Sequence, residues 1–112
     1  MTAQLDPPVL SFAQYLTLER ESGEPHEYID GRTYLMARCT ADHGTMGHSM
    51  GSILRLLLRG GPCRAYPSDV QVRLSATRYV YPDVSVSCDE RDRGMVEQLP
   101  FPRLIVEALS PT

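Results

Sequence analysis

Two acidic residues stand inside apolar, strand-like segments, where an unpaired charge is costly. Asp83 lies in YPDVSV, and Glu107 lies in LIVEAL with aliphatic residues on both sides. Burying an isolated carboxylate costs several kcal/mol unless it is paired, protonated or bound to a metal. One interpretation is structural: Asp83 lies on an exposed face, and Glu107 pairs with an arginine such as Arg73. The other is a divalent-cation site, because neighbouring carboxylates recruit Mg²⁺, an ion suited to phosphoryl chemistry.

Two helices and a hairpin are predicted ahead of these acids. The spacing of Ser11 and Gln14 is that of a capping box, which predicts a helix over about 11–21. A hairpin follows, with Asp30-Gly31 as its turn. A second helix is expected over 42–59. Its apolar residues recur on one stripe, which consists of Met46, Met50, Ile53, Leu54 and Leu57.

Three further strands are predicted, and two of them carry the acids. We expect strands over about 70–74, over 79–88 with Asp83, and over 103–109 with Glu107. The order of helix, hairpin, helix and three strands predicts an α+β domain in which a mixed sheet packs against the helices. Residues 1–112 contain no linker or repeat, so we expect a single domain.

Glycines and histidines of the second helix favour structural roles. Gly44, Gly47 and Gly51 share one side of that helix, which indicates close packing against the sheet or a partner. His43 lies at the edge of the apolar stripe and is more typical of a packed or capping histidine than of a catalytic base. The histidine spacing does not predict a zinc site.

Charge and composition exclude several classes of function. The chain has a net charge of −3 and no lysine, so all eleven basic side chains are arginine. A protein that coats nucleic acid nonspecifically needs excess positive charge, which this chain lacks. The sequence also lacks the nucleophile elbow of a serine hydrolase. If DNA binds, the candidates for phosphate contacts are Arg55, Arg59, Arg64, Arg91 and Arg93.

Cysteine spacing and hydropathy indicate the compartment. Cys39, Cys63 and Cys88 are widely spaced and odd in number. That pattern fits neither a disulfide framework nor a zinc site, so we expect buried free thiols. The sequence has no apolar run of membrane-spanning length and no signal peptide at its start. A cytoplasmic protein without a membrane partner is expected.

Five stretches in order resemble a known family. They are EYIDGRTYLM, His43 at the start of a helix, SDVQVRL, YVYPDVSVSCD and PRLIVEALSPT. Together they are similar to the Uma-type restriction endonuclease family of the PD-(D/E)XK nuclease superfamily, over about residues 11–112. The resemblance implies a restriction-endonuclease-like core and hydrolysis of DNA phosphodiester bonds with Mg²⁺ or Mn²⁺.

The same resemblance implies roles for individual residues. Asp83 matches the aspartate of the PD motif, and Glu107 matches the acid of the (D/E)XK half; both would be metal ligands. Glu27, at the start of the hairpin, matches an acid that joins the metal site from the N-terminal side. Asp69 and His43 match recurrent polar positions whose roles are less defined.

The sequence also departs from the family pattern. Leu109 stands where the superfamily motif has a lysine, and an arginine elsewhere would be a poor proton acceptor. The family's further C-terminal helix and strands are missing from the sequence. We therefore expect an incomplete domain that self-associates or forms a homodimer through its uncovered sheet. The alternative to an enzyme is an inactive nuclease-fold remnant that binds or scaffolds.

Overall fold

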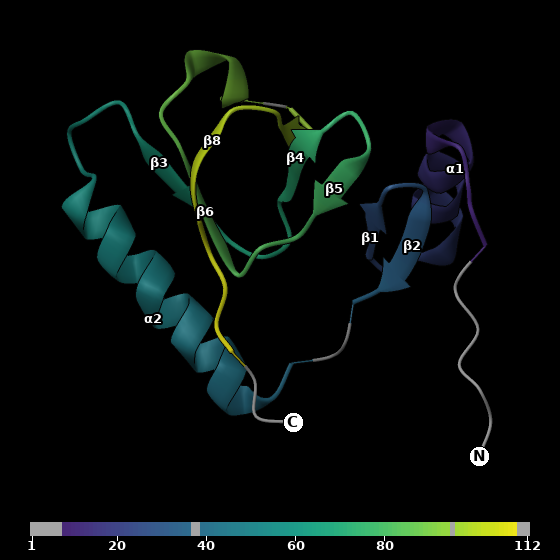
Figure 1. Ribbon diagram of the computed structural model, residues 1–112. Helices are drawn as coiled ribbons and strands as arrows, with labels where there is room; N and C mark the ends of the chain where they lie inside the picture. Colours follow the sequence, from purple (N-terminus) through teal and green to yellow (C-terminus); the bar gives the residue numbers. More distant parts are fainter. Residues whose placement is uncertain (1–7, 37–38, 95, 110–112) are drawn as a thin grey trace.

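Two sheets, each with one helix beside it, make up the described part of the chain (Figure 1). The computed structural model describes residues 8–36, 39–94 and 96–109. The five-stranded sheet has the order β2-β1-β5-β4-β7, and the three-stranded sheet has the order β3-β6-β8. The predicted α+β class is confirmed, although the one expected sheet is divided into two.

The helices are α1 (Phe12–Ser22) and α2 (Ala41–Leu57), and a short 3-10 helix covers Glu90–Asp92. The strands are β1 (His26–Ile29), β2 (Arg32–Leu35), β3 (Arg64–Tyr66), β4 (Gln71–Ser75), β5 (Arg78–Val80), β6 (Val84–Ser87), β7 (Gln98–Leu99) and β8 (Pro102–Val106). All neighbouring strands pair antiparallel except β4 and β7, which are parallel. The larger sheet is therefore mixed, as predicted.

The first helix and the hairpin form where local sequence signals place them. Ser11 Oγ accepts the Gln14 N–H at 3.2 Å, and Gln14 Oε1 accepts the Ser11 N–H at 2.8 Å, which completes the capping box. The hairpin turns at Asp30 and Gly31, whose φ angles are 49° and 91°. Two left-handed residues are what the commonest two-residue hairpin turn requires. Both predictions are confirmed.

Tyrosines from three elements form the core beneath α1. Tyr15 of α1, Tyr28 of β1 and Tyr79 of β5 are each at most 5% exposed, and Phe12 packs against them. The rings of Tyr15 and Tyr28 stack with centroids 4.8 Å apart. The Tyr28 hydroxyl donates to the carbonyl oxygen of Leu10 at 2.8 Å, so its polar end is satisfied inside the core.

The prediction of one continuous strand over 79–88 is wrong. Pro82 is buried and separates β5 from β6, which belong to different sheets. A proline has no N–H to donate to a strand ladder, so pairing stops at this position. Beyond the proline, β6 is buried along its whole length between β3 and β8. The short strands β3 and β7 were not predicted from the sequence.

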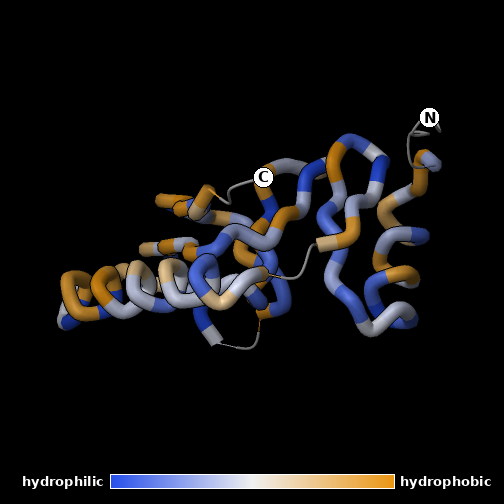
Figure 2. Tube along the Cα trace, turned by 90° about the horizontal axis from the view of Figure 1, so that it is seen from below, coloured by the Kyte–Doolittle hydropathy of each residue, from blue (hydrophilic) through white to orange (hydrophobic). Residues whose placement is uncertain are grey.

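The glycine side of α2 packs on β6. A Cβ atom at Gly47 would lie 3.9 Å from Cβ of Asp83, and one at Gly51 would lie 3.8 Å from Cγ2 of Val84. The predicted close packing against the sheet is confirmed. Leu54 of the apolar stripe is half-buried but its other residues are exposed, and Figure 2 shows hydrophobic residues concentrated toward the C-terminal end of α2. Residues 40% to 75% exposed are Met46, Met50, Ile53, Leu56 and Leu57.

Cys63 and Cys88 form a disulfide, so the expectation of free thiols is wrong for this pair. Cys39 is free but exposed rather than buried. The β3–β6 register pairs Arg64 with Ser87, and one step further it sets the two bonded cysteines opposite each other. Sequence spacing could not reveal the pair because only the strand register brings positions 25 residues apart together.

The molecule is elongated. Its Cα radius of gyration is 15.3 Å, against about 13 Å for a compact domain of this length, and its extents are 50 × 32 × 21 Å. The two sheets lie side by side along this length (Figure 1). Among the described helices, neither has the length and apolar character needed to cross a membrane.

Candidate functional site

Asp83 and Glu107 face each other at the end of a strand pair. In the β6–β8 ladder, Val84 pairs with Val106, and the same register sets Asp83 opposite Glu107 one step beyond. Facing residues of antiparallel strands hold their Cβ atoms about 5 Å apart. The structure therefore brings together the two acids that stand out in the sequence.

The Asp83 carboxylate is held on both of its oxygens. Oδ1 lies 2.9 Å from Nε2 of His43, and Oδ2 accepts the N–H of Ala108 at 2.6 Å. An ionised carboxylate only accepts hydrogen bonds, so we assign the imidazole proton to Nε2. Thr40 caps α2 by accepting the N–H of His43 at 3.1 Å, which fixes the first helical turn. His43 thus reaches Asp83 from the start of α2.

The carboxyl group of Glu107 is electrostatically coupled to its neighbours. Partial loss of hydration raises its pKa above the usual 4.5, and the negative charges of Asp83 and Glu27 raise it further, while His43 opposes the shift. Among the described residues, Glu107 and Arg73 form no ion pair. The structural alternative, a salt bridge between these two residues, is therefore not formed.

Glu27 approaches the site from the other sheet. It lies on β1, and its Oε2 accepts the N–H of Tyr81 at 3.2 Å. Tyr81 belongs to the segment that connects β5 with β6, two residues before Asp83. The carboxylate of Glu27 therefore adds negative charge near Glu107 while it holds the connection between the sheets in place.

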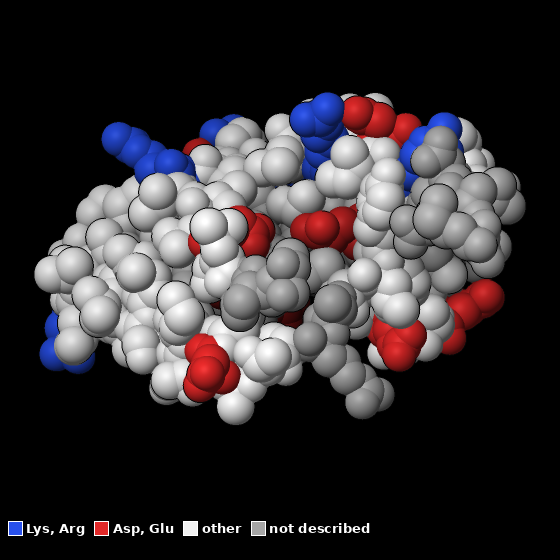
Figure 3. All heavy atoms as spheres, turned by 60° about the horizontal axis from the view of Figure 1, so that its bottom comes forward, with Lys and Arg blue, Asp and Glu red and all other residues white. Residues whose placement is uncertain are grey.

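A cleft of about 890 Å³ opens beside this group. Its walls include Asp83 and His43, and also Asp69, which is exposed just before β4. Glu27 and Glu107 are not part of the described wall. Figure 3 shows acidic side chains gathered in a hollow of this face, with the arginines nearer its edges. The predicted polar positions Asp69 and His43 thus share a cavity with Asp83.

A hydrogen-bonded network in the same cleft was not predicted from the sequence. The hydroxyl of Tyr81 donates to Oε2 of Glu19 at 2.7 Å, and Oε1 of Glu19 accepts the N–H of His26 at 2.8 Å. Burial and the charge of Glu19 raise the pKa of Tyr81, so this hydroxyl remains a donor. The only available sequence signal was the position of Tyr81 two residues before Asp83. Nothing in α1 distinguishes Glu19 from the helix's other acids.

The carboxylate oxygens of this site are the type of ligand that Mg²⁺ prefers, but they come from few residues. Within the described residues, no group of three or more His, Cys, Asp or Glu side chains lies close enough to hold a metal ion together. Mg²⁺ is commonly held by one or two carboxylates, with water and substrate phosphate completing its shell. Asp83 and Glu107 supply two such carboxylates. The His43 imidazole and the Ala108 N–H each bond one oxygen of Asp83, and a hydrogen bond between the Asp83 and Glu107 side chains also helps to raise the pKa of Glu107.

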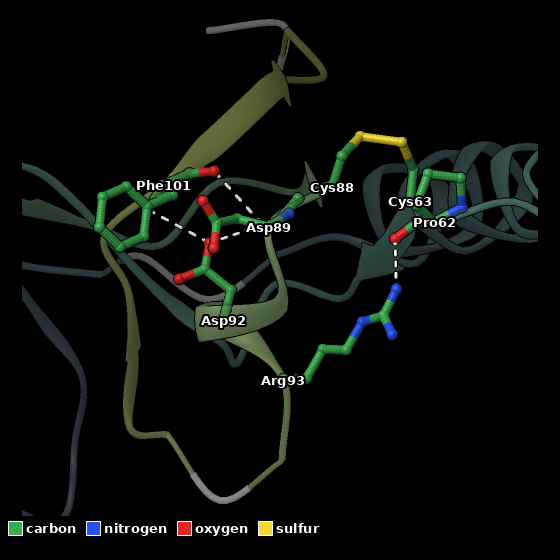
Figure 4. The surroundings of a disulfide bond; sticks show 8 residues. Pro62, Cys63, Cys88, Asp89, Asp92, Arg93 and Phe101 are labelled. Atoms are coloured by element: carbon green, nitrogen blue, oxygen red, sulfur yellow. Dashed lines mark hydrogen bonds between the residues drawn. A yellow bond between two sulfur atoms is a disulfide. The ribbon is translucent and has the colours of Figure 1, made fainter.

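Two of the candidate phosphate-binding arginines have protein partners. Arg91 pairs with Asp89 at 2.7 Å, and its guanidinium lies 3.5 Å above the ring of Phe101. Arg93 donates to the carbonyl oxygen of Pro62 at 2.7 Å, beside the disulfide (Figure 4). Arg55, in contrast, lines the cleft. It is the best placed of the predicted arginines to meet a phosphate there.

Residues 12–112 match the sequence model of the Uma2 family, described as "Putative restriction endonuclease". Two relatives come from Synechocystis sp. (strain ATCC 27184 / PCC 6803 / Kazusa). "Uncharacterized protein slr1290" is 38% identical over 106 residues, which cover 94% of this chain and 56% of the relative. "Uncharacterized protein sll1609" is 29% identical over 105 residues, which cover 91% and 59%. The chain thus spans a little over half the length of these relatives. No solved structure matches it.

Proposed function

Because the chain belongs to the Uma2 family, we propose that it carries the catalytic acids of an endonuclease that hydrolyses DNA phosphodiester bonds. The observation that carries this proposal is Asp83 facing Glu107 beside a cleft, with His43 bonded to Asp83. PD-(D/E)XK nuclease chemistry is consistent with that family and with paired carboxylates. Arg55 on the cleft wall would contact a backbone phosphate.

The contacts of each site residue support a specific role for it. Asp83 and Glu107 would hold Mg²⁺ or Mn²⁺, with Glu27 adding negative charge. When bound, such an ion supplies positive charge that stabilises a phosphoryl group under attack. His43 and the Ala108 N–H orient the Asp83 carboxylate, so that its remaining lone pairs are pre-positioned.

The test is nicking of supercoiled plasmid DNA with Mg²⁺ or Mn²⁺. We expect Asp83→Asn and Glu107→Gln each to reduce cleavage at least about 100-fold, because even outer-shell changes cost 10–100-fold at metal sites. Glu21→Gln is the matched control, since it removes one exposed acid of α1. Cleavage that persists in both site variants would refute the assignment.

A second candidate is a non-catalytic binding module, and the absence of lysine from the chain favours it. Calorimetric titration with Mg²⁺ and Mn²⁺ separates the two proposals. A nuclease site gives saturable binding that disappears in Asp83→Asn and Glu107→Gln. The non-catalytic module gives no saturable metal binding and no cleavage.

A further inference from the structure

The apolar stripe of α2 is exposed although the helix is long. None of the residues of α2 is buried, and Met46, Met50, Ile53 and Leu57 are 56%, 40%, 53% and 75% exposed. A 17-residue helix in a protein normally gains its stability by packing an apolar face. Here the contact with β6 is made by glycines, which bury little area. The stripe therefore requires a cover outside the described fold.

The spacing of the stripe is that of a helix–helix seam. Its four exposed residues, Met46, Met50, Ile53 and Leu57, are separated by four, three and four positions, which is the a/d spacing of a coiled-coil heptad. The stripe contains no charged residue, so nothing in it opposes burial. Leu56, 62% exposed, lies beside the seam and would widen it.

The stripe is also complementary to itself. If two copies of α2 pack antiparallel with the centre of the seam between positions 50 and 53, Met46 of each copy meets Leu57 of the other. The same register brings Met50 against Ile53. Every contact then occurs twice, as an isologous twofold interface requires.

The area is sufficient for a weak specific dimer. Covering five side chains with these exposed fractions removes roughly 500 Å² from each copy, or about 1,000 Å² in total, which is the lower limit for a specific interface. The elongated shape, with a radius of gyration of 15.3 Å, leaves α2 accessible along one side of the molecule (Figures 1 and 2).

We infer that α2 is a self-association surface, and that two copies of this chain pack antiparallel through Met46, Met50, Ile53 and Leu57. This inference is independent of the nuclease proposal, because the stripe points away from the glycine side that meets Asp83 and Val84. A dimer would place one cleft on each copy, beside a shared helix pair.

The test combines two charge variants with sedimentation equilibrium. Met46→Glu and Leu57→Arg each place a charge in the seam at a position that is 56% or 75% exposed in the single chain, so folding should be retained. We expect the wild-type chain to dimerise at micromolar concentration. Each variant alone should weaken the dimer at least about tenfold.

The mixed sample identifies the register. When the Met46→Glu chain is mixed with the Leu57→Arg chain, a heterodimer should form, because the antiparallel pairing sets the new carboxylate of one chain against the new guanidinium of the other. Thr45→Glu and Ser52→Arg, on the other side of the helix, are the matched controls and should dimerise like wild type. Circular dichroism confirms that each variant keeps its helices.

Three results would overturn the inference. A wild-type chain that stays monomeric up to about 100 μM, the range of weak protein association, would show that a different partner covers the stripe. A mixture that stays monomeric, while each variant is folded, would exclude the antiparallel pairing. If the control variants dimerise as weakly as the seam variants, the interface lies elsewhere on the chain.

Discussion

A single carboxylate, Asp83, connects three parts of the molecule. Its oxygens are bonded to the imidazole of His43 in α2 and to the N–H of Ala108 after β8, while its backbone follows Pro82 out of β5. Its side chain is only 16% exposed, so these partners replace most of its hydration. A side chain held in this way keeps one orientation, which is what a metal ligand or a general base requires.

Glu107 should destabilise the fold when it is ionised. Its pKa is raised in the folded protein, so the protonated form is favoured there, and stability falls as the pH rises through the raised value. We expect Glu107→Gln to increase the free energy of unfolding at pH 7, by less than about 1 kcal/mol because the group is partly solvated. The gain should shrink as the pH falls toward 4.5, the usual value for a glutamate.

Urea unfolding between pH 4 and pH 7, at one protein concentration, measures this effect without added metal. Glu21→Gln is again the control, because it removes an exposed acid far from the site in the sequence. A Glu107→Gln chain that is less stable than wild type at pH 7 would contradict the prediction. It would mean that the ionised carboxylate has a stabilising partner.

At the scale of elements, the geometry of the site depends on how closely α2 approaches β6. Gly47 and Gly51 allow this approach, and His43 on the same helix can then reach Asp83. A helix with larger residues on this side would stand further from the strand. The glycines therefore keep this side of α2 small, at a cost to helix stability of up to about 1 kcal/mol each relative to alanine.

Substitutions at Gly51 should separate these two effects. Its added Cβ would lie 3.8 Å from Val84, an ordinary contact, so Gly51→Ala should stabilise the chain by about 0.5–1 kcal/mol through helix propensity. Gly51→Leu should destabilise it by about 1–3 kcal/mol, because the larger side chain overpacks the helix–strand contact. Denaturant unfolding measures both changes.

Gly60→Ala is the control, because it measures the cost of replacing a glycine where only the backbone conformation matters. It lies in open space but has a φ of 83°, so Gly60→Ala should cost about 1 kcal/mol through backbone strain alone. If Gly51→Ala destabilises the chain as much as Gly60→Ala does, the side of α2 that meets β6 has no room for a larger side chain.

At the scale of the whole molecule, the two sheets are joined through the β5–β6 connection and the acids around it. Tyr15, Tyr28 and Tyr79 form a core under the five-stranded sheet, while α2 belongs to the three-stranded one. If the chain is a single domain, as expected, its two halves should unfold cooperatively. Both halves should unfold together if the connection couples them.

Two spectroscopic probes test this cooperativity. The chain has no tryptophan, and three of its six tyrosines lie in the aromatic core, so tyrosine fluorescence reports in large part on that half. Far-ultraviolet circular dichroism reports on both helices, with 17 residues in α2 and 11 in α1. We expect coincident urea transitions, with midpoints that agree within error. Separate transitions would show that the chain consists of two independently stable halves.

The sequence by itself determined those features that depend on neighbouring residues. Ser11 and Gln14 fix the start of α1, Asp30-Gly31 fixes the hairpin, and the spacing of glycines in 41–57 fixes the side of α2 that meets a strand. The two acids beside apolar strand segments and the family were likewise visible, because they depend on residue type and order along the chain; the strands themselves end one residue short of each acid.

Tertiary structure alone decided which distant residues meet. Pro82 divides an alternating run between two sheets, and strand register joins Cys63 to Cys88 and sets Asp83 against Glu107. The sequence marks His43 as a polar position, but it does not show that this imidazole from α2 and a backbone N–H after β8 both bond Asp83. Periodicity shows that apolar residues of α2 share a face, but it does not show what covers that face. The physical reason is the same in each case: local rules constrain the chain within a few residues, whereas pairing and burial depend on the path of the whole chain.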